Sequence, residues 1–379
     1  MPLWIALLLS VLHIASNKSD IHRNEVSMIR IGTRKSKLAL IQTELVKTQI
    51  LKYFPNEKIE IVHVVTHGDK VLDKPLGEIG GKGVFTKEIE EKLLDKTIDI
   101  AVHSAKDVPM ELADGLCLGA VLLRDDNRDV ILKRKETKKI GAGSIIGTSS
   151  LRREIQIKQI SPDVTIKSLR GNVGTRIDKL KLGEYDAIIL AAAGLKRLGL
   201  DNDTELDYIY PDEEKFISAA GQGILAIECR NGDLKDVMAV LDDRKARICL
   251  EAEREFLKCL DGSCNAPCGA HCTVDEHGFY FRGMYAYDGK TPKYAVINEK
   301  TDEQWEKISE PVNADNTDLK FAISLAKRLV DVLKSDAKNT DIKNEDNSDS
   351  IYEGRHMLSD FYIKIAELCC KTAGMCNVY

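Results

Sequence analysis

The segment that decides the fold class runs from residue 129 to 194 and reads DVILKRKETKKIGAGSIIGTSSLRREIQIKQISPDVTIKSLRGNVGTRIDKLKLGEYDAIILAAAG. The short apolar runs DVILKR, SIIGTSS, VTIKSLR and YDAIILAAAG are separated in part by two stretches of helical period, which begin at Leu151 and at about Val173. Strands that alternate with helices indicate βαβ units and a parallel sheet. We therefore predict an α/β domain over residues 123–220.

The same alternation precedes this segment. MIRIGT, KIEIVHVVT and IDIAVHS resemble strands, and the residues between them predict helices over Lys37–Tyr53 and near Phe85–Lys96. The apolar end of FISAAGQGILAIEC, residues 216–229, predicts a strand that could return to this first sheet. The first α/β domain would then be discontinuous, with residues 28–122 and 221–240.

The residues after 240 follow a different pattern. A charged helix, RKARICLEAEREFLKCL, comes first, and a cysteine-rich loop, the strands GFYFRGMYAY and YAVIN, and a helix near Leu319–Leu333 follow it. This order predicts a third, α+β domain over residues 241–379. Within that domain, residues 334–350 are polar and lack a hydrophobic period, so we expect a disordered insertion there.

Residues 1–27 are interpreted as a targeting leader. Positions 2–16, PLWIALLLSVLHIAS, form an apolar run that is short for a spanning helix and typical of a secretory leader; a buried N-terminal strand or helix is the alternative. The ten cysteines lie in a chain large enough to need no disulfides, so we expect mostly free thiols. A leader combined with reduced cysteines predicts a plastid-like organelle reached through the secretory route, and the cytoplasm is the alternative.

Composition excludes few functions. At 379 residues, with 43% apolar and 30% charged residues, the chain suits two or three soluble domains. The aromatic content of 6% argues against a surface that stacks nucleic-acid bases, and a net charge of −5 gives no general attraction for polyanions. Any anion site must therefore come from a local cluster of Arg and Lys.

Six arginines at strand ends or helix starts predict such a cluster. They occur in GTRKSKLAL, GTSSLRRE, SLRGNVGTR and AAGLKRLG, as Arg34, Arg152, Arg153, Arg170, Arg176 and Arg197. Each lies near Gly, Ser, Thr or Asn, where the backbone N–H groups of a helix start already favour anions. Guanidinium groups there predict a carboxylate or phosphate clamp, whereas ordinary surface charge is the alternative. Loops at the carboxyl ends of strands gather at one crevice in α/β domains, so we expect these motifs to converge.

Two more motifs carry charged side chains that suit catalysis or anion binding. HSAKDVP, residues 103–109, places Lys106 beside Asp107: the carboxylate is a candidate acid/base or stabiliser of positive charge, and the amine is a candidate partner for a substrate carboxylate. A surface turn with a weak salt bridge is the alternative. GEIGGKGVFTKEIEEKL, residues 77–93, lacks the P-loop order and predicts either a mobile loop that brings Lys82 to an anion or a plain flexible connection.

The segment KCLDGSCNAPCGAHC, residues 258–272, concentrates thiols. Its side chains of the kinds that bind metal ions are Cys259, Cys264, Cys268, His271 and Cys272. Zinc suits these ligand types, although two well-spaced CxxC pairs are absent from the segment. The other interpretation is one nucleophilic thiol, Cys264, on a glycine-flanked turn, with the remaining cysteines as small buried hydrophobes.

Eight motifs together resemble those of one family, the porphobilinogen deaminases. They are HSAKDVP, IGTRKSKLAL, GGKGVFTKE, GTSSLRR, RGNVGTR, AAGLKRLG, AAGQGILAIE and the GSC loop, and the resemblance covers roughly residues 28–300. It implies two doubly wound α/β domains like those of type II periplasmic binding proteins, and a small α+β C-terminal domain with the cofactor loop. It also implies a transferase of tetrapyrrole and heme biosynthesis that condenses four porphobilinogen molecules, with loss of ammonia, and releases hydroxymethylbilane by hydrolysis.

The resemblance further implies roles for individual residues. Cys264 would carry a dipyrromethane cofactor through a thioether, with no metal or external coenzyme, and Asp107 and Lys106 would be catalytic. The cofactor-binding residues would be Arg34, Ser36, Lys106, Ser150, Arg152, Arg153 and Arg170, and the substrate-binding residues Arg34, Lys82, Arg170, Arg176 and Arg197. We expect a monomer with a small-molecule substrate and, once mature, neither nucleic acid nor membrane as partner. From the residues alone, the alternative is a two-lobed anion-binding protein without catalysis.

Overall fold

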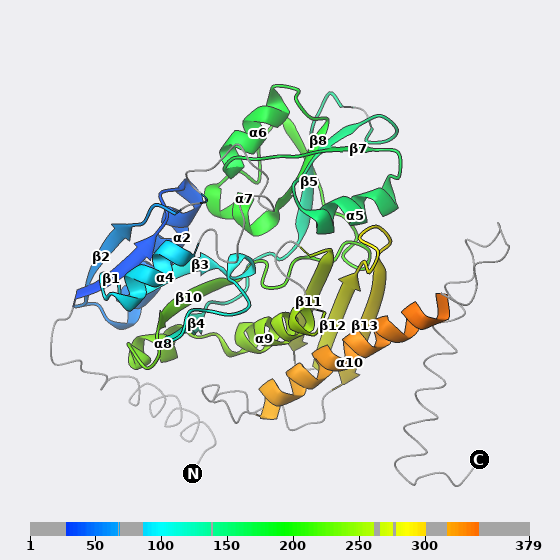
Figure 1. Cartoon of the computed structure of the whole chain (residues 1–379). Helices are drawn as coiled ribbons and strands as arrows, with labels where there is room; N and C mark the ends of the chain where they lie inside the picture. The colour runs from blue at the N-terminus through cyan, green and yellow to red at the C-terminus, as the bar shows by residue number, and fades with distance from the viewer. Residues whose placement is uncertain are drawn as a thin grey trace, which may run out of the picture. The chain divides into compact units, whose positions relative to one another are not determined.

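The computed structural model describes residues 28–66, 68, 86–137, 139–260, 266–275, 278–300 and 317–340. Their strands form three β-sheets, two of five strands and one of three, with helices packed around them (Figure 1). The described residues up to Leu333 belong to one compact unit, and those from Lys334 onward belong to a second. Two α/β sheets followed by a small α+β part confirm the predicted fold class.

The first sheet has the strand order β2-β1-β3-β10-β4. Its strands are β1 (Met28–Thr33), β2 (Lys58–His63), β3 (Ile100–Ser104), β4 (Leu116–Val121) and β10 (Leu225–Arg230). β1 runs parallel to β2 and β3, whereas β10 is antiparallel to both of its neighbours. The apolar run at residues 216–229 thus supplies a strand of this sheet, and the sheet is mixed, with the predicted parallel pairs and two antiparallel ones. The reason is that β10 enters on the return from the second sheet, which reverses its direction.

Three helices pack on the first sheet. They are α2 (Lys37–Tyr53), α4 (Lys87–Leu94) and α8 (Lys235–Leu241). α2 has the predicted bounds, because its N-cap Ser36 accepts a hydrogen bond from the Ala39 N–H (3.3 Å) and its residues Val46 and Ile50 are fully buried. α4 ends earlier than predicted, since Lys96 adopts a left-handed backbone conformation with φ of 62°.

The second sheet has the order β7-β6-β8-β5-β9. Its strands are β5 (Asp129–Arg134), β6 (Ile145–Gly147), β7 (Thr165–Lys167), β8 (Ala187–Ala191) and β9 (Leu206–Ile209), and its helices are α5 (Leu151–Ile160), α6 (Val173–Lys181) and α7 (Ala192–Leu198). β6 is parallel to β7 and β8, but β5 is antiparallel to β8 and β9. This sheet is also mixed, because β5 enters it directly from the first sheet.

Two chain segments connect these sheets side by side. One leads from β4 to β5 through Asp125, and the other returns to β10 through Gly223, whose carbonyl accepts a hydrogen bond from the Asp125 N–H (3.2 Å). Gly223 has a φ of +92°, and a Cβ there would lie 2.5 Å from the Asp125 carbonyl oxygen, so the position requires glycine. Arg197 in α7 donates to the Gly223 carbonyl (2.6 Å) and pairs with the Asp125 carboxylate (3.6 Å). These bonds fix the two segments to each other.

A three-stranded antiparallel sheet and two helices form the remaining part. The elements are β11 (Cys268–Asp275), β12 (Gly278–Tyr285), β13 (Lys293–Lys300), α9 (Arg244–Cys259) and α10 (Thr317–Thr340), and Figure 1 shows α9 and α10 beside the sheet. Phe256 of α9 and Phe281 of β12 are fully buried and meet edge to face, with ring centroids 5.8 Å apart. Buried Glu253 of α9 accepts hydrogen bonds from the Gly221 N–H (2.7 Å) and from Arg124 (2.7 Å), and so ties this part to both connecting segments.

Two predictions for this part need correction. Cys268, His271 and Cys272 lie in β11 and not in a loop, because alternate residues of this segment pack into the core. α10 continues to Thr340, into the stretch predicted as irregular from residue 334, since neither Pro nor Gly interrupts it there. Residues 341–350 of that stretch lie outside the described residues.

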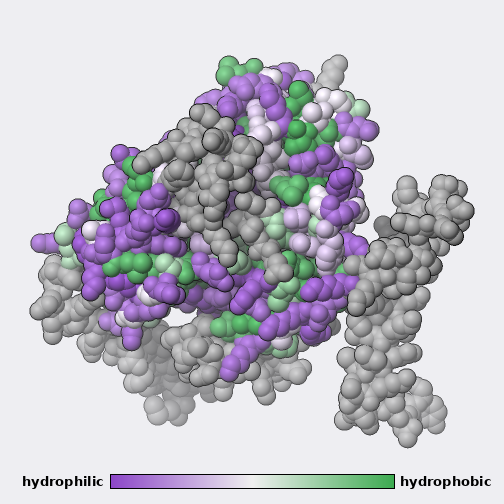
Figure 2. Space-filling view, in the orientation of Figure 1, coloured by the Kyte–Doolittle hydropathy of each residue, from purple (hydrophilic) through white to green (hydrophobic). Residues whose placement is uncertain are grey.

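The face of the molecule in Figure 2 is mainly hydrophilic, and its apolar residues gather in small separate groups. In the part of the chain that the structure describes, no helix is both long and apolar enough to cross a bilayer. The predicted leader, residues 1–27, lies outside that part.

Candidate active site

The turn after β3 carries the two ionisable residues of HSAKDVP. A 3-10 helix, η1 (Ala105–Asp107), begins where β3 ends. Ala105 and Val108 are buried, and the Ala105 N–H donates to the Ile224 carbonyl of the returning segment (3.0 Å). These apolar residues anchor the turn on both sides, while Lys106 is half-buried and Asp107 is exposed. The turn therefore holds one cation and one carboxylate at the carboxyl end of β3, the central strand of the first sheet.

A second group of charges lies at the starts of α5 and β5. The guanidinium groups of Arg152 and Arg153 are buried, and each pairs with the Asp129 carboxylate at 2.7 Å. Arg152 also donates to the Ile217 carbonyl (2.7 Å), and Arg153 to the Ile189 carbonyl (2.9 Å). Burial by itself would raise the pKa of Asp129, but the two guanidinium groups hold it well below its usual range. Asp129 is therefore an anion at neutral pH and fixes both arginines.

Gln222 connects the two groups. The Lys106 ammonium donates to Gln222 Oε1 (3.2 Å), and Gln222 Nε2 donates to Asp129 Oδ1 (3.1 Å) and to the Asn127 carbonyl (2.7 Å). Sequence reasoning singled out neither Gln222 nor Asp129. The sequence did contain a signal for Gln222, because it stands between two glycines, Gly221 and Gly223. In the structure these glycines adopt positive φ values of 72° and 92°, so the backbone on both sides of Gln222 is constrained.

Arg176 and Arg170 lie within electrostatic range of these charges. Arg176 in α6 is half-buried, and its Nε donates to the Gly171 carbonyl (2.8 Å). Burial lowers the pKa of Arg176 to about 10, the positive charges of Arg153 and Arg170 act in the same direction, and Asp107 opposes them. These interactions indicate that charged side chains from both α/β regions lie close together.

The residues so assembled are called the charge cluster below. Its members are Lys106, Asp107, Asp129, Arg152, Arg153, Arg170 and Arg176. Burial lowers the pKa of Lys106 to about 8, with Asp107 acting against the shift, so Lys106 is mostly a cation at neutral pH. The cluster then holds five cations against two carboxylates, an excess that suits a ligand with several carboxylate groups.

Four other predicted residues have different surroundings. Arg34 is half-buried directly after β1, and the Ser36 hydroxyl is the N-cap of α2. Ser150 is the N-cap residue of α5, but its side chain makes no capping hydrogen bond. The Arg197 side chain is 9% exposed and pairs with Asp125, so the structure gives it a place between the connecting segments and not in the charge cluster. The remaining predicted residues, Lys82 and Cys264, lie outside the described residues.

The candidate metal ligands of β11 are buried among other side chains. Cys268 and Cys272 pack in the sheet core as small hydrophobes, and His271 Nδ1 lies 2.7 Å from a guanidinium nitrogen of Arg282. Burial, together with the charges of Arg124 and Arg282, lowers the pKa of His271. Among the described residues, no three His, Cys, Asp or Glu side chains are grouped so that they could hold a metal ion.

Comparison with known proteins assigns the chain to a family. The model of the "Porphobilinogen deaminase, dipyromethane cofactor binding domain" matches residues 29–237, and that of the "Porphobilinogen deaminase, C-terminal domain" matches residues 247–330. The porphobilinogen deaminase of Macrococcus caseolyticus is 44% identical over 275 residues, which cover 71% of this chain and 89% of the relative. That of Staphylococcus carnosus is 45% identical over 266 residues, which cover 69% and 86%. These relatives are bacterial and give no support to the predicted plastid-like location.

Similarity to solved structures is much lower. The crystal structure of full-length BenM is 16% identical and covers 62% of this chain and 72% of that chain, with a TM-score of 0.37, which supports no assignment. The first family model, in contrast, matches more than half of this chain, and both curated relatives are covered over most of their length. The chain therefore belongs to the porphobilinogen deaminase family.

Proposed function

We propose that the charge cluster is the active site of a hydroxymethylbilane synthase and that Asp107 is its catalytic carboxylate. As a porphobilinogen deaminase, the enzyme condenses four porphobilinogen molecules, with loss of ammonia, and releases hydroxymethylbilane by hydrolysis. The observation that carries the proposal is an exposed Asp107 carboxylate within reach of the charges of Lys106, Arg153 and Arg176. A carboxylate so placed is able to meet the reacting atoms while the cations bind the carboxylates of the substrate.

The arginines of the second sheet would orient the substrate. Each porphobilinogen unit carries an acetate and a propionate group, and guanidinium groups bind carboxylates in a directional, often bidentate way. We assign this task to Arg170 and Arg176, with Arg34 and Lys82 from the first α/β region. Each added unit brings more negative charge, so an excess of cations is required for the chain to grow within one site. Arg197 is assigned to holding the connecting segments, because its guanidinium is already paired with Asp125.

Asp107 would stabilise the charge that develops during the reaction. When ammonia leaves the aminomethyl group, positive charge forms on the pyrrole, and a fixed carboxylate lowers the energy of that state. The same carboxylate can accept a hydrogen bond from the pyrrole N–H. This role needs a negative charge and room for the ligand, and the exposure of Asp107 provides the room.

The dipyrromethane cofactor of the family suits the charge cluster. Its carboxylate side chains require cationic partners, and the cluster has five cations against two carboxylates. We assign the thioether to Cys264 and the binding of the cofactor carboxylates to Arg34, Ser36, Lys106, Ser150, Arg152, Arg153 and Arg170. When bound, the cofactor supplies the pyrrole carbon to which the first substrate unit is joined. All three guanidinium nitrogens of Arg153 already donate to Asp129 or Ile189, so its contribution is mainly its charge.

The experiment that tests this proposal is the intact mass of the purified protein without residues 1–27, compared with its Cys264→Ser variant. We expect a surplus mass equal to two linked pyrrole units in the parent protein and none in the variant. A bare polypeptide mass that stays bare after incubation with porphobilinogen would contradict the proposal and favour a protein that only binds anions.

The domain boundaries, oligomeric state and location are also proposals. We propose domains at 28–122 with 221–240, at 123–220 and at 241–379, in a monomer whose residues 1–27 direct it to a plastid-like organelle. The boundaries rest on the change of pattern along the sequence, and the location rests on the apolar run at residues 2–16. Fusion of residues 1–27 to a fluorescent protein in plastid-bearing cells tests the location, and a diffuse cytoplasmic signal would contradict it. A sedimentation measurement tests the monomer.

A further inference from the structure

Two thiols of the first sheet face each other across neighbouring strands. Cys117 of β4 lies directly opposite Cys229 of β10 in an antiparallel pair, and their Sγ atoms are 3.9 Å apart. Residues directly opposite on antiparallel strands have Cα atoms about 4.5 to 5.5 Å apart, which is inside the range of about 4.4 to 6.8 Å that a disulfide bridges. Side-chain rotation is therefore sufficient to join the two sulfurs, and the strands can stay in place.

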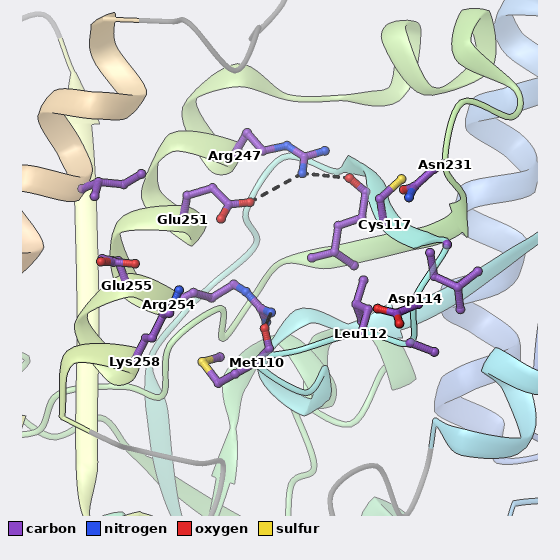
Figure 3. Close-up of a pocket in the computed structure, with 15 residues that line it drawn as sticks. Met110, Leu112, Asp114, Cys117, Asn231, Arg247, Glu251, Arg254, Glu255 and Lys258 are labelled. Carbon is purple, nitrogen blue, oxygen red and sulfur yellow. Dashed lines mark hydrogen bonds and ion pairs between the residues drawn. The ribbon is translucent and has the colours of Figure 1, made fainter.

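The two thiols differ in their access to solvent. Cys117 is half-buried and lines a cavity of about 580 Å³, in which Asn231 and Arg247 are neighbouring residues (Figure 3). Cys229 is 1% exposed and belongs to the apolar core of the first sheet, with Met238 of α8. A small reagent that enters the cavity therefore reaches Cys117 first, and Cys229 is the thiol directly behind it.

The surroundings also assign different chemistry to the two sulfurs. The hydrogen bond from Cys229 lowers the pKa of Cys117 to about 7, and the Arg247 guanidinium adds to this effect, against burial and the carboxylates of Glu228 and Asp233. The same hydrogen bond and burial raise the pKa of Cys229. Cys117 is thus the nucleophilic thiolate, and Cys229 is the protonated partner.

We propose that Cys117 and Cys229 form a reversible dithiol–disulfide site that hydroperoxides oxidise. The Cys117 thiolate attacks one oxygen of hydrogen peroxide, the O–O bond breaks, and Cys117 becomes a sulfenic acid; the hydroxide that leaves takes up the proton that Cys117 had released. The Cys229 sulfur then attacks the Cys117 sulfur, the S–O bond breaks, and the Cys229 proton leaves with the hydroxide as water. In total the two thiols lose two electrons and two protons, and the peroxide is reduced to two water molecules.

This site is separate from the charge cluster. In the pairing of β10 with β3, Leu225 lies opposite Ser104, next to η1, whereas Cys229 lies opposite Ile100 at the other end of the strand. Oxidation of the pair therefore uses no residue of the charge cluster, and it does not use Cys264, to which the cofactor is assigned. The two thiols give the chain a place to react with oxidants at a distance from its chemistry.

A second cysteine pair serves as an internal control. Cys249 of α9 and Cys272 of β11 share a hydrogen bond, as Cys117 and Cys229 do, but they are only 5% and 1% exposed and lie in the core of the third sheet. Neither lines the cavity that Cys117 borders. Contact between thiols is present in both pairs, so a difference in reactivity must come from the cavity and the lowered pKa of Cys117, and not from thiol contact alone.

The test is oxidation of the reduced full-length protein with hydrogen peroxide, followed by alkylation of free thiols and mass mapping of the peptides without reduction. We expect a cross-linked peptide that joins Cys117 to Cys229, lighter by two hydrogens and returned to thiols by a dithiol reductant, while Cys249 and Cys272 stay free. No cross-link at Cys117, or an equal yield of the cross-link between Cys249 and Cys272, would overturn the proposal.

Two variants separate the steps. Cys117→Ser should abolish the cross-link, leave Cys229 as a free thiol and keep turnover at the parent level. Cys229→Ser, whose hydroxyl still donates a hydrogen bond to Cys117, should stop the reaction at a sulfenic acid on Cys117 that a carbon nucleophile traps. In the reduced parent protein, alkylation of Cys117 at about pH 7 should be roughly tenfold faster than that of an ordinary thiol. An ordinary rate, or a missing sulfenic acid in a folded Cys229→Ser protein, would contradict the assignment.

Discussion

The turn after β3 and the start of β5 each bring one aspartate to the charge cluster, in opposite surroundings. Asp107 on the turn is exposed, whereas Asp129 is 2% exposed and accepts hydrogen bonds from Arg152, Arg153 and Gln222. The first carboxylate is open to a ligand, and the second is occupied in holding protein side chains. Burial and pairing, more than residue type, therefore distinguish the carboxylate to which we assign the chemistry from the one that holds the protein together.

The largest effect is expected from Asp107→Asn. The amide keeps the size of the side chain but removes the charge to which we assign stabilisation of the developing cation, so turnover should fall about 100-fold or more. Formation of hydroxymethylbilane from porphobilinogen is the measurement. The thermal midpoint should stay at the parent value, because Asp107 is exposed. Near-normal turnover of the folded variant would remove Asp107 from the mechanism and, with it, the contrast with Asp129.

The main effect of Asp129→Asn should be a loss of stability. The substitution leaves the buried guanidinium groups of Arg152 and Arg153 without their anion, which is expected to cost about 3 kcal/mol of the free energy of unfolding. Urea unfolding measures this quantity. Asp126→Asn is the matched control: its pair with Arg128 is partly solvent-exposed, so that change should cost less than about 1 kcal/mol. Equal losses in the two variants would contradict the structural role of Asp129.

Arg176→Leu tests the cations that we assign to the substrate. Leucine cannot make the charge-assisted hydrogen bond to a substrate carboxylate that we assign to Arg176, so KM should rise about 30-fold, and addition of successive pyrrole units should slow. Stepwise elongation, followed by separation of the enzyme intermediates, measures both effects. Lys158→Leu removes a cation whose partner, Glu154, lies in the same helix, and it should leave KM and elongation unchanged. The same response in both variants would mean that only general charge matters.

Much of the local structure could be predicted from the sequence. α2 begins and ends where the helical pattern of its sequence placed it, and β5 coincides with the run DVILKR. The motif HSAKDVP and the arginines of GTSSLRR and RGNVGTR do converge in one cluster, because loops at strand ends meet in α/β folds. Short-range periodicity is sufficient to predict the helices and strands, and the general topology of α/β folds is sufficient to predict that these motifs converge.

Features that depend on long-range pairing could not be predicted. The direction of β10 depends on a return from the second sheet, and no local pattern contains this information. Gln222 donates a hydrogen bond to Asp129 across 93 positions of sequence. The arginines that pair with Asp129 lie 23 and 24 positions away from it. Arg197 shared its glycine-rich setting with the other arginines, but a specific tertiary partner, Asp125, decides its place. Local chemistry identified the candidate residues, and only the folded structure shows the tertiary partners of each of them.

The smallest effect expected is a pH dependence that arises at Lys106, the cation nearest to Asp107 in sequence. Burial lowers the pKa of Lys106 to about 8, so the charge cluster loses one of its five positive charges as the ammonium loses its proton, and substrate binding should weaken. Between about pH 7 and about pH 8.5 the charged fraction falls about fourfold, and KM should rise by a similar factor. Lys106→Arg keeps the charge over this range and should remove the dependence. An identical KM profile in parent and variant would assign the pH effect to another group.

The same residue makes an opposite prediction for stability, which distinguishes a buried cation from a general loss of structure at alkaline pH. The folded pKa of Lys106, about 8, lies below its ordinary value of 10.5, so between these values the unfolded chain binds more protons than the folded protein. The contribution of Lys106 to the free energy of unfolding must therefore rise with pH over this window, while substrate binding falls. The difference in urea stability between the parent and Lys106→Met should follow that rise, because methionine does not titrate. A difference that stays constant from about pH 7 to about pH 10 would show that the ammonium is as well solvated in the fold as in the unfolded chain, and Lys106 would then share the exposed situation of Asp107 and not the enclosed situation of Asp129.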